Sequence, residues 1–186
     1  CFVAYEPTAR MVEAVATMVP TVQSGFQLTA QAVEAAITPR TKALLIASPN
    51  NPTGTTIDPD EQARIAAVAE KHDLVVISDE IYEYINFVGK HESIAQFADL
   101  KDRVIIVNGL SKGFAMTGWR LGYIAAHADI AKACEKIQGQ FTSGTNSITQ
   151  KAAVVALTTD LRPTMEMVEE FTRRRTKVLE IVKDIP

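Results

Sequence analysis

Lys112 lies in a setting that suits covalent chemistry. It belongs to the segment NGLSKGFAMTGWRLGY (residues 108–123), which begins in an apolar run rich in β-branched residues. Mostly apolar surroundings favour the neutral amine, which is the form that attacks an aldehyde. Eight positions further on, Arg120 offers a planar fork that grips a phosphate through two hydrogen bonds, and the neighbouring glycines permit close backbone approach. Taken alone, Lys112 also fits an ordinary surface lysine.

Two more polar loops follow apolar runs. In SPNNPTG (residues 48–54), the prolines and the glycine fix a tight backbone path that would hold Asn51 rigidly. In SDEIY (residues 78–82), Asp79 follows a buried run and precedes Tyr82. A carboxylate in such a place needs hydrogen-bond donors or a cationic partner, for example a protonated pyridine nitrogen. A plain turn at Asn51 and a helix cap at Asp79 remain open as structural readings.

The spacing of the apolar runs predicts α/β architecture with a mostly parallel sheet. Short runs rich in β-branched residues alternate with helical patterns, and each run is nearly all apolar, as in strands that are covered on both faces. We expect strands at residues 43–47, 74–78, 104–108 and 121–125, and helices at residues 29–37, 58–72, 128–139, 147–158 and 164–185. In open α/β sheets the ligand crevice lies outside the carboxyl ends of the strands. The three polar loops are therefore expected to form one site.

The composition narrows the class of protein. The 186 residues are 47% hydrophobic, enough for one good core, and the formal net charge is −3. This charge gives no basis for a general attraction to nucleic acid or anionic lipid, and no apolar run reaches the roughly 18 residues that span a bilayer. Two cysteines and three widely spaced histidines indicate neither a disulfide framework nor a metal site. We expect a cytoplasmic protein that binds small molecules, with no nucleic acid, membrane or metal partner.

Together, the three loops resemble the class I/II, fold-type I aminotransferases, which depend on pyridoxal 5′-phosphate (PLP). The resemblance implies that Lys112 forms the aldimine with PLP and that Arg120 holds the phosphate of PLP. It implies further that Asn51 and Tyr82 hydrogen-bond the phenolic oxygen, and that Asp79 pairs with the pyridine nitrogen. In the family, the lysine also moves the proton between the substrate and the cofactor. Lys112, Asp79 and Tyr82 are therefore the expected catalytic residues.

Other positions match the family more loosely. The family places an aromatic ring against the cofactor near the front of this region, which implies Phe2 or, as second choice, Tyr5. Gly109 stands where the family often has a phosphate-binding serine, which leaves Ser111 and residues outside the sequence as the other hydroxyl candidates for the phosphate. The glycine pair that usually follows the first segment is replaced by Glu and Ala at positions 13–14.

The resemblance also implies a domain organisation. Residues 1–160 correspond to a PLP-binding large domain of three α/β/α layers, incomplete at its N-terminus. Residues 161–186 correspond to an interdomain helix that leads to a small second domain outside the sequence, so the chain is expected to be an internal fragment. The arginine for the substrate α-carboxylate and a glycine-containing phosphate loop would lie outside it. The full-length protein is expected to be a homodimer, because the family's sites lie at a dimer interface.

The activity implied by the resemblance is transamination of an amino acid with a 2-oxo acid. Residues 136–150 (KIQGQFTSGTNSITQ) resemble the aspartate aminotransferase branch, which favours aspartate and 2-oxoglutarate as the substrates. The fragment alone is expected to be inactive. A PLP-dependent lyase of the same fold and a truncated homologue without catalytic activity are the alternatives. A nicotinamide-binding domain is disfavoured, since no G-x-G-x-x-G motif follows a strand.

Overall fold

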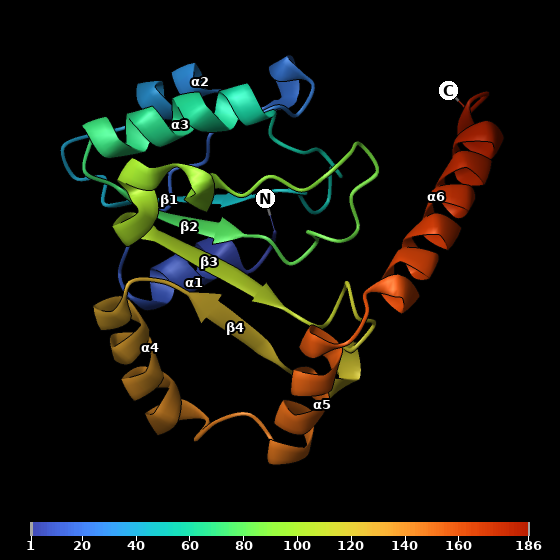
Figure 1. Cartoon of the computed structure of the whole chain (residues 1–186). Helices are drawn as coiled ribbons and strands as arrows, with labels where there is room; N and C mark the ends of the chain where they lie inside the picture. The colour runs from blue at the N-terminus through green and yellow to red at the C-terminus, as the bar shows by residue number, and fades with distance from the viewer. Residues whose placement is uncertain (1, 186) are drawn as a thin grey trace.

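A four-stranded sheet forms the centre of the computed structural model, which describes residues 2–185 apart from the side chains at positions 98, 99 and 101 (Figure 1). Its strands are β1 (Ala43–Ala47), β2 (Val75–Asp79), β3 (Val104–Gly109) and β4 (Gly122–Ala125), in that spatial order. β1, β2 and β3 are parallel, and β4 runs antiparallel to β3. The predicted strands are confirmed to within one residue at each end, and so is the mostly parallel α/β sheet.

The helices begin and end at residues whose side chains explain the boundaries. The α-helices are α1 (Tyr5–Met11), α2 (Ala30–Ala36), α3 (Pro59–Lys71), α4 (Ala128–Phe141), α5 (Ser147–Thr158) and α6 (Arg162–Val182), and the 3₁₀ helices are η1 (Val22–Ser24), η2 (Ile94–Gln96), η3 (Ala98–Arg103) and η4 (Thr117–Trp119). The Asp58 carboxylate accepts hydrogen bonds from the first amides of α3, and Pro59 occupies its first turn. Thr29 caps α2 in the same way. The five predicted helices are confirmed, whereas α1 and the 3₁₀ helices were not predicted.

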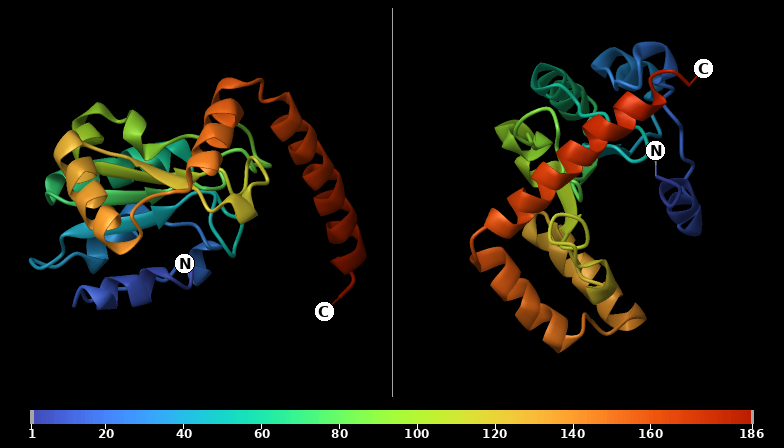
Figure 2. Two further views of the ribbon diagram at one scale, coloured as in Figure 1. Left: turned by 90° about the horizontal axis from the view of Figure 1, so that it is seen from below. Right: turned by 90° about the vertical axis from the view of Figure 1, so that its right-hand side faces the viewer.

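The hydrophobic core lies between α3 and one face of the sheet. Ile65 and Ala69 of α3 are fully buried, and they belong to one cluster with Ile46, Val76 and Val104 of the first three strands. η2 and η3 cover the same face and add Ile94 and Leu100 to the cluster. α1 lies on the opposite side of the sheet (Figure 2). Helices on both faces give the expected α/β layers, and they leave the carboxyl ends of the strands open.

The C-terminal helices pack loosely on the rest of the chain. α4 buries none of its residues, and α5 buries Thr149 and Ala153. α6 stands apart from the sheet in both figures, with the guanidinium of Arg175 lying 5.6 Å from the ring centre of Phe87 in the loop after β2. A short bend at residues 159–161 leads into α6, and the domain boundary expected at residues 160 and 161 stays a prediction. Among the helices that the structure describes, none is long and apolar enough to cross a bilayer.

Replacement of Ile65 tests the position of the core. Ile65 is 0% exposed, so Ile65→Ala is expected to lower the free energy of unfolding by about 2–5 kcal/mol, through lost apolar burial and the cavity left behind. Urea unfolding of the chain measures this loss. Ile137, in α4, is 61% exposed and serves as the matched control: Ile137→Ala is expected to change the free energy by less than about 0.5 kcal/mol. Equal losses in the two variants would contradict this core.

Candidate functional site

The sheet brings all three site-bearing loops to one edge. The carboxyl ends of β1, β2 and β3 lie together because these strands are parallel, and β4 begins at the same edge because it is antiparallel. Asp79 pairs in register with Ala47 and Val107, and its carbonyl accepts a hydrogen bond from the Ser48 amide at 3.2 Å. The loops that carry Asn51, Tyr82, Lys112 and Arg120 therefore leave or enter the sheet side by side.

Two other predicted site residues, Asn51 and Lys112, lie next to Tyr82. The Asn51 side-chain amide donates a hydrogen bond to the Tyr82 hydroxyl at 3.4 Å. The Nζ atom of Lys112 lies 5.6 Å from the centre of the Tyr82 ring. All three side chains are half-buried. An amide, a phenol and an amine from three separate loops thus share one small volume.

Asp79 has hydrogen-bond donors, as its position after a buried strand requires. One carboxylate oxygen accepts from the Tyr5 hydroxyl at 2.6 Å, and the other accepts from the Ile81 amide at 3.1 Å. Burial and the neighbouring Asp79 carboxylate raise the pKa of the Tyr5 phenol well above its usual value near 10. The stacking expected of Tyr5, as second choice, stays a prediction. Its hydroxyl helps to orient the Asp79 carboxylate.

Phe2 and Tyr5 pack edge to face, with ring centres 5.8 Å apart, and Phe2 is 41% exposed. The stacking role expected of Phe2 stays a prediction, and so does the phosphate contact expected of Ser111. The need of Asp79 for a donor was apparent in the sequence, but the identity of that donor was not. Tyr5 lies 74 positions away along the chain, and only the unpredicted helix α1 brings it to Asp79.

The loop between β3 and β4 holds a strained backbone. Ala115 and Arg120 have φ angles of 53° and 54°, in the left-handed region that non-glycine residues rarely adopt. Strain of this kind persists where the surroundings enforce it, commonly at binding sites. Gly109 shows how tight the loop is: a Cβ atom there would lie 2.9 Å from the Leu121 carbonyl oxygen and 3.0 Å from the Gly122 Cα. Glycine at this position is therefore a steric requirement of this chain.

Arg120 lies at the end of the strained loop, just before β4, and it is exposed at the sheet edge. Its guanidinium donates a hydrogen bond to the Thr117 carbonyl at 3.1 Å. A guanidinium has five N–H donors, so this contact leaves donors for an anion. Its place is consistent with the predicted phosphate contact, which stays a prediction.

The loop after β1 follows the tight path that its prolines and glycine predicted. The Asn50 amide donates to the Thr55 carbonyl, and the Gly54 amide donates back to the Asn50 carbonyl, each at 2.8 Å. Gly54 has a φ angle of 69°, a conformation that glycine adopts without strain. The peptide bonds before Pro49 and Pro52 are both cis. The two hydrogen bonds of Asn50 close the loop in which Asn51 lies.

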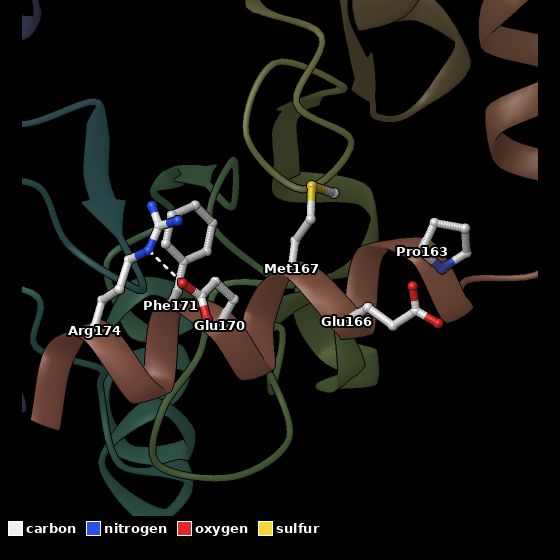
Figure 3. Close-up of a pocket in the computed structure, with 6 residues that line it drawn as sticks. All are labelled: Pro163, Glu166, Met167, Glu170, Phe171 and Arg174. Carbon is white, nitrogen blue, oxygen red and sulfur yellow. Dashed lines mark hydrogen bonds and ion pairs between the residues drawn. The ribbon is translucent and has the colours of Figure 1, made fainter.

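A surface hollow elsewhere in the structure carries none of this chemistry. It lies along α6 and is lined by Pro163, Glu166, Met167, Glu170, Phe171 and Arg174 (Figure 3). The one ion pair drawn there joins the Arg174 guanidinium to the exposed Glu170 carboxylate at 2.7 Å. No group of histidine, cysteine, aspartate and glutamate side chains suited to a metal ion occurs in the part of the chain that the structure describes.

The residues at the sheet edge fit PLP by the chemistry of their groups. Lys112 supplies an amine for the aldehyde, and Asp79 supplies a carboxylate for a protonated ring nitrogen. Asn51 and Tyr82 supply neighbouring donors for an anionic oxygen, and Arg120 supplies a fork for a phosphate. Each of these groups comes from the end of a strand or from a loop at the same edge of the sheet.

Comparison with known proteins agrees with this set of groups. Residues 1–185 match the family described as aminotransferase class I and II. The chain belongs to this family. It is 45% identical over 159 residues to a bifunctional aspartate aminotransferase and glutamate/aspartate-prephenate aminotransferase of Petunia hybrida, covering 84% of this chain and 33% of the relative.

Two solved structures of aminotransferases are also similar to this chain. A double mutant of the Thermus thermophilus aspartate aminotransferase superposes with a TM-score of 0.93 at 38% identity, covering 98% of this chain and 48% of the other. An aromatic aminotransferase of Pyrococcus horikoshii OT3 gives a TM-score of 0.95 at 37% identity, covering 99% and 50%. The chain therefore spans between a third and a half of the length of these aminotransferases.

The contact between Tyr5 and Asp79 predicts a pH effect on stability. Because folding raises the pKa of Tyr5, its contribution is fully present below about pH 10, the pKa of an unfolded tyrosine, and is lost as the pH rises toward the folded value. The free energy of unfolding between pH 9 and 12 should therefore fall more steeply in the wild type than in Tyr5→Phe. Asp79→Asn should make the fall in unfolding free energy less steep but not abolish it, since burial still raises the pKa of Tyr5 when the Asp79 charge is removed. Parallel curves for Tyr5→Phe and the wild type would contradict this account.

Proposed function

We propose that this chain is the cofactor-binding part of a PLP-dependent aminotransferase, with Lys112 as the residue that bonds to PLP. The observation that carries the proposal is the meeting of Asn51, Tyr82 and Lys112 at the sheet edge where Asp79 ends β2. Membership of the aminotransferase class I and II family supports it. The proposed division of the chain is a PLP-binding part at residues 1–160 and a connecting helix at residues 161–186.

Each protein group has a separate task in the proposed reaction. PLP, when bound, supplies an electron sink for the charge that develops when the substrate Cα loses its proton. Lys112 holds the cofactor and then, as a free amine, accepts and returns that proton. Asp79 keeps a proton on the ring nitrogen by stabilising its positive charge. Tyr82 and Asn51 donate hydrogen bonds to the ring oxygen.

The remaining cofactor contacts fix its position. Arg120 and Ser111 bind the phosphate, and Phe2 lies against the ring. Tyr5 holds the Asp79 carboxylate by its 2.6 Å hydrogen bond, so that the carboxylate faces the ring nitrogen with its orientation already set. A site whose groups are oriented before binding loses less entropy when the reaction begins.

Aspartate and 2-oxoglutarate are the proposed substrates. Residues 136–150 resemble the aspartate aminotransferase branch, and the relatives from Petunia hybrida and Thermus thermophilus bear aspartate in their names. The similar protein from Pyrococcus horikoshii is named for aromatic substrates, so the choice of amino donor needs its own test. We further propose that the full-length protein is a cytoplasmic homodimer and that this chain alone is inactive.

Reductive labelling tests the role of Lys112. After addition of PLP to the chain, a visible absorption band is expected, and borohydride reduction should then fix one pyridoxyl group on Lys112, as read by peptide mass spectrometry. Lys112→Ala should abolish the band and the label, because the Lys112 amine is the one that lies beside Tyr82 at this sheet edge. Lys136→Ala, in α4, is the matched control and should retain both. A label at another lysine, or no band at all, would refute the assignment; the latter is the result expected of a non-binding homologue.

Product analysis tests the reaction class. With aspartate and 2-oxoglutarate, a full-length protein that contains this sequence should form glutamate, whereas a lyase of the same fold would release ammonia instead. This chain alone should be slower by a factor of roughly a hundred or more, since small displacements of bound substrate already reduce rates by that order. A coupled assay for oxaloacetate measures the rate of transamination by the full-length protein and by the chain alone. Turnover by the chain equal to that of the full-length protein would overturn the proposed inactivity.

A further inference from the structure

Glu80 is a buried carboxylate to which the proposed reaction gives no task. It follows Asp79 directly, and it is only 3% exposed. Its first oxygen accepts hydrogen bonds from the hydroxyls of Ser78 at 2.9 Å and Ser93 at 2.7 Å. Its second oxygen lies 2.9 Å from the Nε2 atom of His91, whose side chain is 13% exposed. A buried charge is costly without such partners, so the full set of contacts shows that the carboxylate is built into this place.

The cluster of Ser78, Glu80, His91 and Ser93 is not arranged as a nucleophile. In a catalytic triad the serine hydroxyl donates to the histidine and the histidine donates to the carboxylate. Here both serine hydroxyls donate to the carboxylate itself. The arrangement therefore joins segments of chain and activates no hydroxyl.

The segments joined by Glu80 are the two ends of one loop. Ser78 lies in β2, while His91 and Ser93 lie after the loop of residues 81–90, directly before η2. A second contact holds the returning end: the side-chain amide of Gln62, on α3, donates to the Glu92 carbonyl at 3.0 Å. Residues 80–93 thus form a closed loop whose base is fastened to the sheet by Glu80 and to α3 by Gln62.

Tyr82 lies within this closed loop, two residues from its fastened base. Its hydroxyl accepts the hydrogen bond from Asn51, and its ring lies beside Lys112. The backbone amide of Glu80, at the start of the same turn, donates to the Val107 carbonyl of β3 at 2.9 Å. The turn after β2 is therefore joined to the loop after β1 by Tyr82, and to β3 by the Glu80 amide.

We propose that Glu80 is a positioning residue for the PLP site: by closing the base of the loop 80–93, it holds the Tyr82 hydroxyl against Asn51 and beside Lys112. This inference rests on the proposed function, since Tyr82 needs a fixed place because it donates to the ring oxygen of PLP. The contribution of Glu80 is geometric. It comes from three hydrogen bonds that fix the backbone of the turn.

The charge of Glu80 is maintained by the same contacts. Burial alone raises the pKa of the Glu80 carboxyl, but the hydrogen bonds from His91, Ser93 and Ser78 outweigh burial and leave the pKa below its usual value. The folded pKa is lowered, so this stabilisation is present above the unfolded value of about 4.3 and is lost as the pH falls below it. At neutral pH the carboxylate remains an acceptor for both hydroxyls.

Three variants separate geometry from charge. Glu80→Ala removes all three hydrogen bonds. Glu80→Gln keeps an oxygen for Ser78 and Ser93 and places an amide opposite His91, whose neutral ring accepts a hydrogen bond from it through Nε2. Glu70→Ala, on the exposed face of α3, removes a glutamate that plays no part in the site and serves as the matched control.

Two measurements on the full chain test the inference. Without PLP, amide hydrogen exchange in residues 81–93 should be about tenfold faster or more in Glu80→Ala, and close to the wild type in Glu80→Gln and Glu70→Ala. With PLP, the dissociation constant should rise about tenfold in Glu80→Ala and less than threefold in the other two. Combined with Tyr82→Phe, the Glu80→Ala change should add little further loss, because both changes act on the same hydroxyl.

The outcomes distinguish this inference from the proposed function. Unchanged exchange and affinity in Glu80→Ala, losses in Glu80→Gln equal to those in Glu80→Ala, or additive losses with Tyr82→Phe would each overturn it. If the wild type binds no PLP at Lys112, the proposed function fails. The hydrogen-exchange measurement does not depend on PLP, so unchanged exchange in Glu80→Ala would separately overturn the claim that Glu80 closes the loop. If Glu80→Ala does not fold, Ser93→Ala, which removes a single donor, should give smaller changes in the same direction.

Discussion

The parallel register of β1, β2 and β3 is the constraint on which the rest of the site depends. Backbone hydrogen bonds continue past the strand ends, from the Ser48 amide to the Asp79 carbonyl and from the Glu80 amide to the Val107 carbonyl. These backbone bonds align the three strand ends independently of the side chains. β4 then reverses direction, which returns Arg120 to the edge that the chain left at Gly109. An amine and a guanidinium from one continuous loop are thereby held at the same edge as the Asp79 carboxylate.

The site shows two ways of holding a functional group in place. The loop after β3 uses backbone strain, with Ala115 and Arg120 in left-handed conformations and Gly109 in a space that admits no Cβ atom. The turn after β2 uses side-chain hydrogen bonds, with Tyr5 on Asp79 and three donors on Glu80. Both devices restrict side-chain and backbone freedom before a ligand binds, which lowers the entropic cost of binding.

Local signals explain how much of this could be predicted from the sequence. The strands were predictable because each is a short apolar run, and α3 because Asp58 and Pro59 mark its start. Asn51, Asp79, Tyr82, Lys112 and Arg120 were predictable as a group because each stands in a polar loop beside a strand end. The contacts of Tyr5 and Glu80 were not, because they join residues far apart or across a loop. The short helix α1 was missed because it buries no residue and so leaves no apolar stripe to recognise.

The loop 80–93 is held in different ways at its base and at its tip, where Phe87 contacts Arg175. Its base is fastened by buried hydrogen bonds, whereas at its tip the exposed ring of Phe87 lies against the Arg175 guanidinium of α6, a contact worth about 0.5–1 kcal/mol. Loss of the contact at the tip therefore costs the loop little, whereas the buried hydrogen bonds of Glu80 continue to hold its base. The position of Tyr82, near the base, is thus independent of the contact that the tip makes with the C-terminal helix.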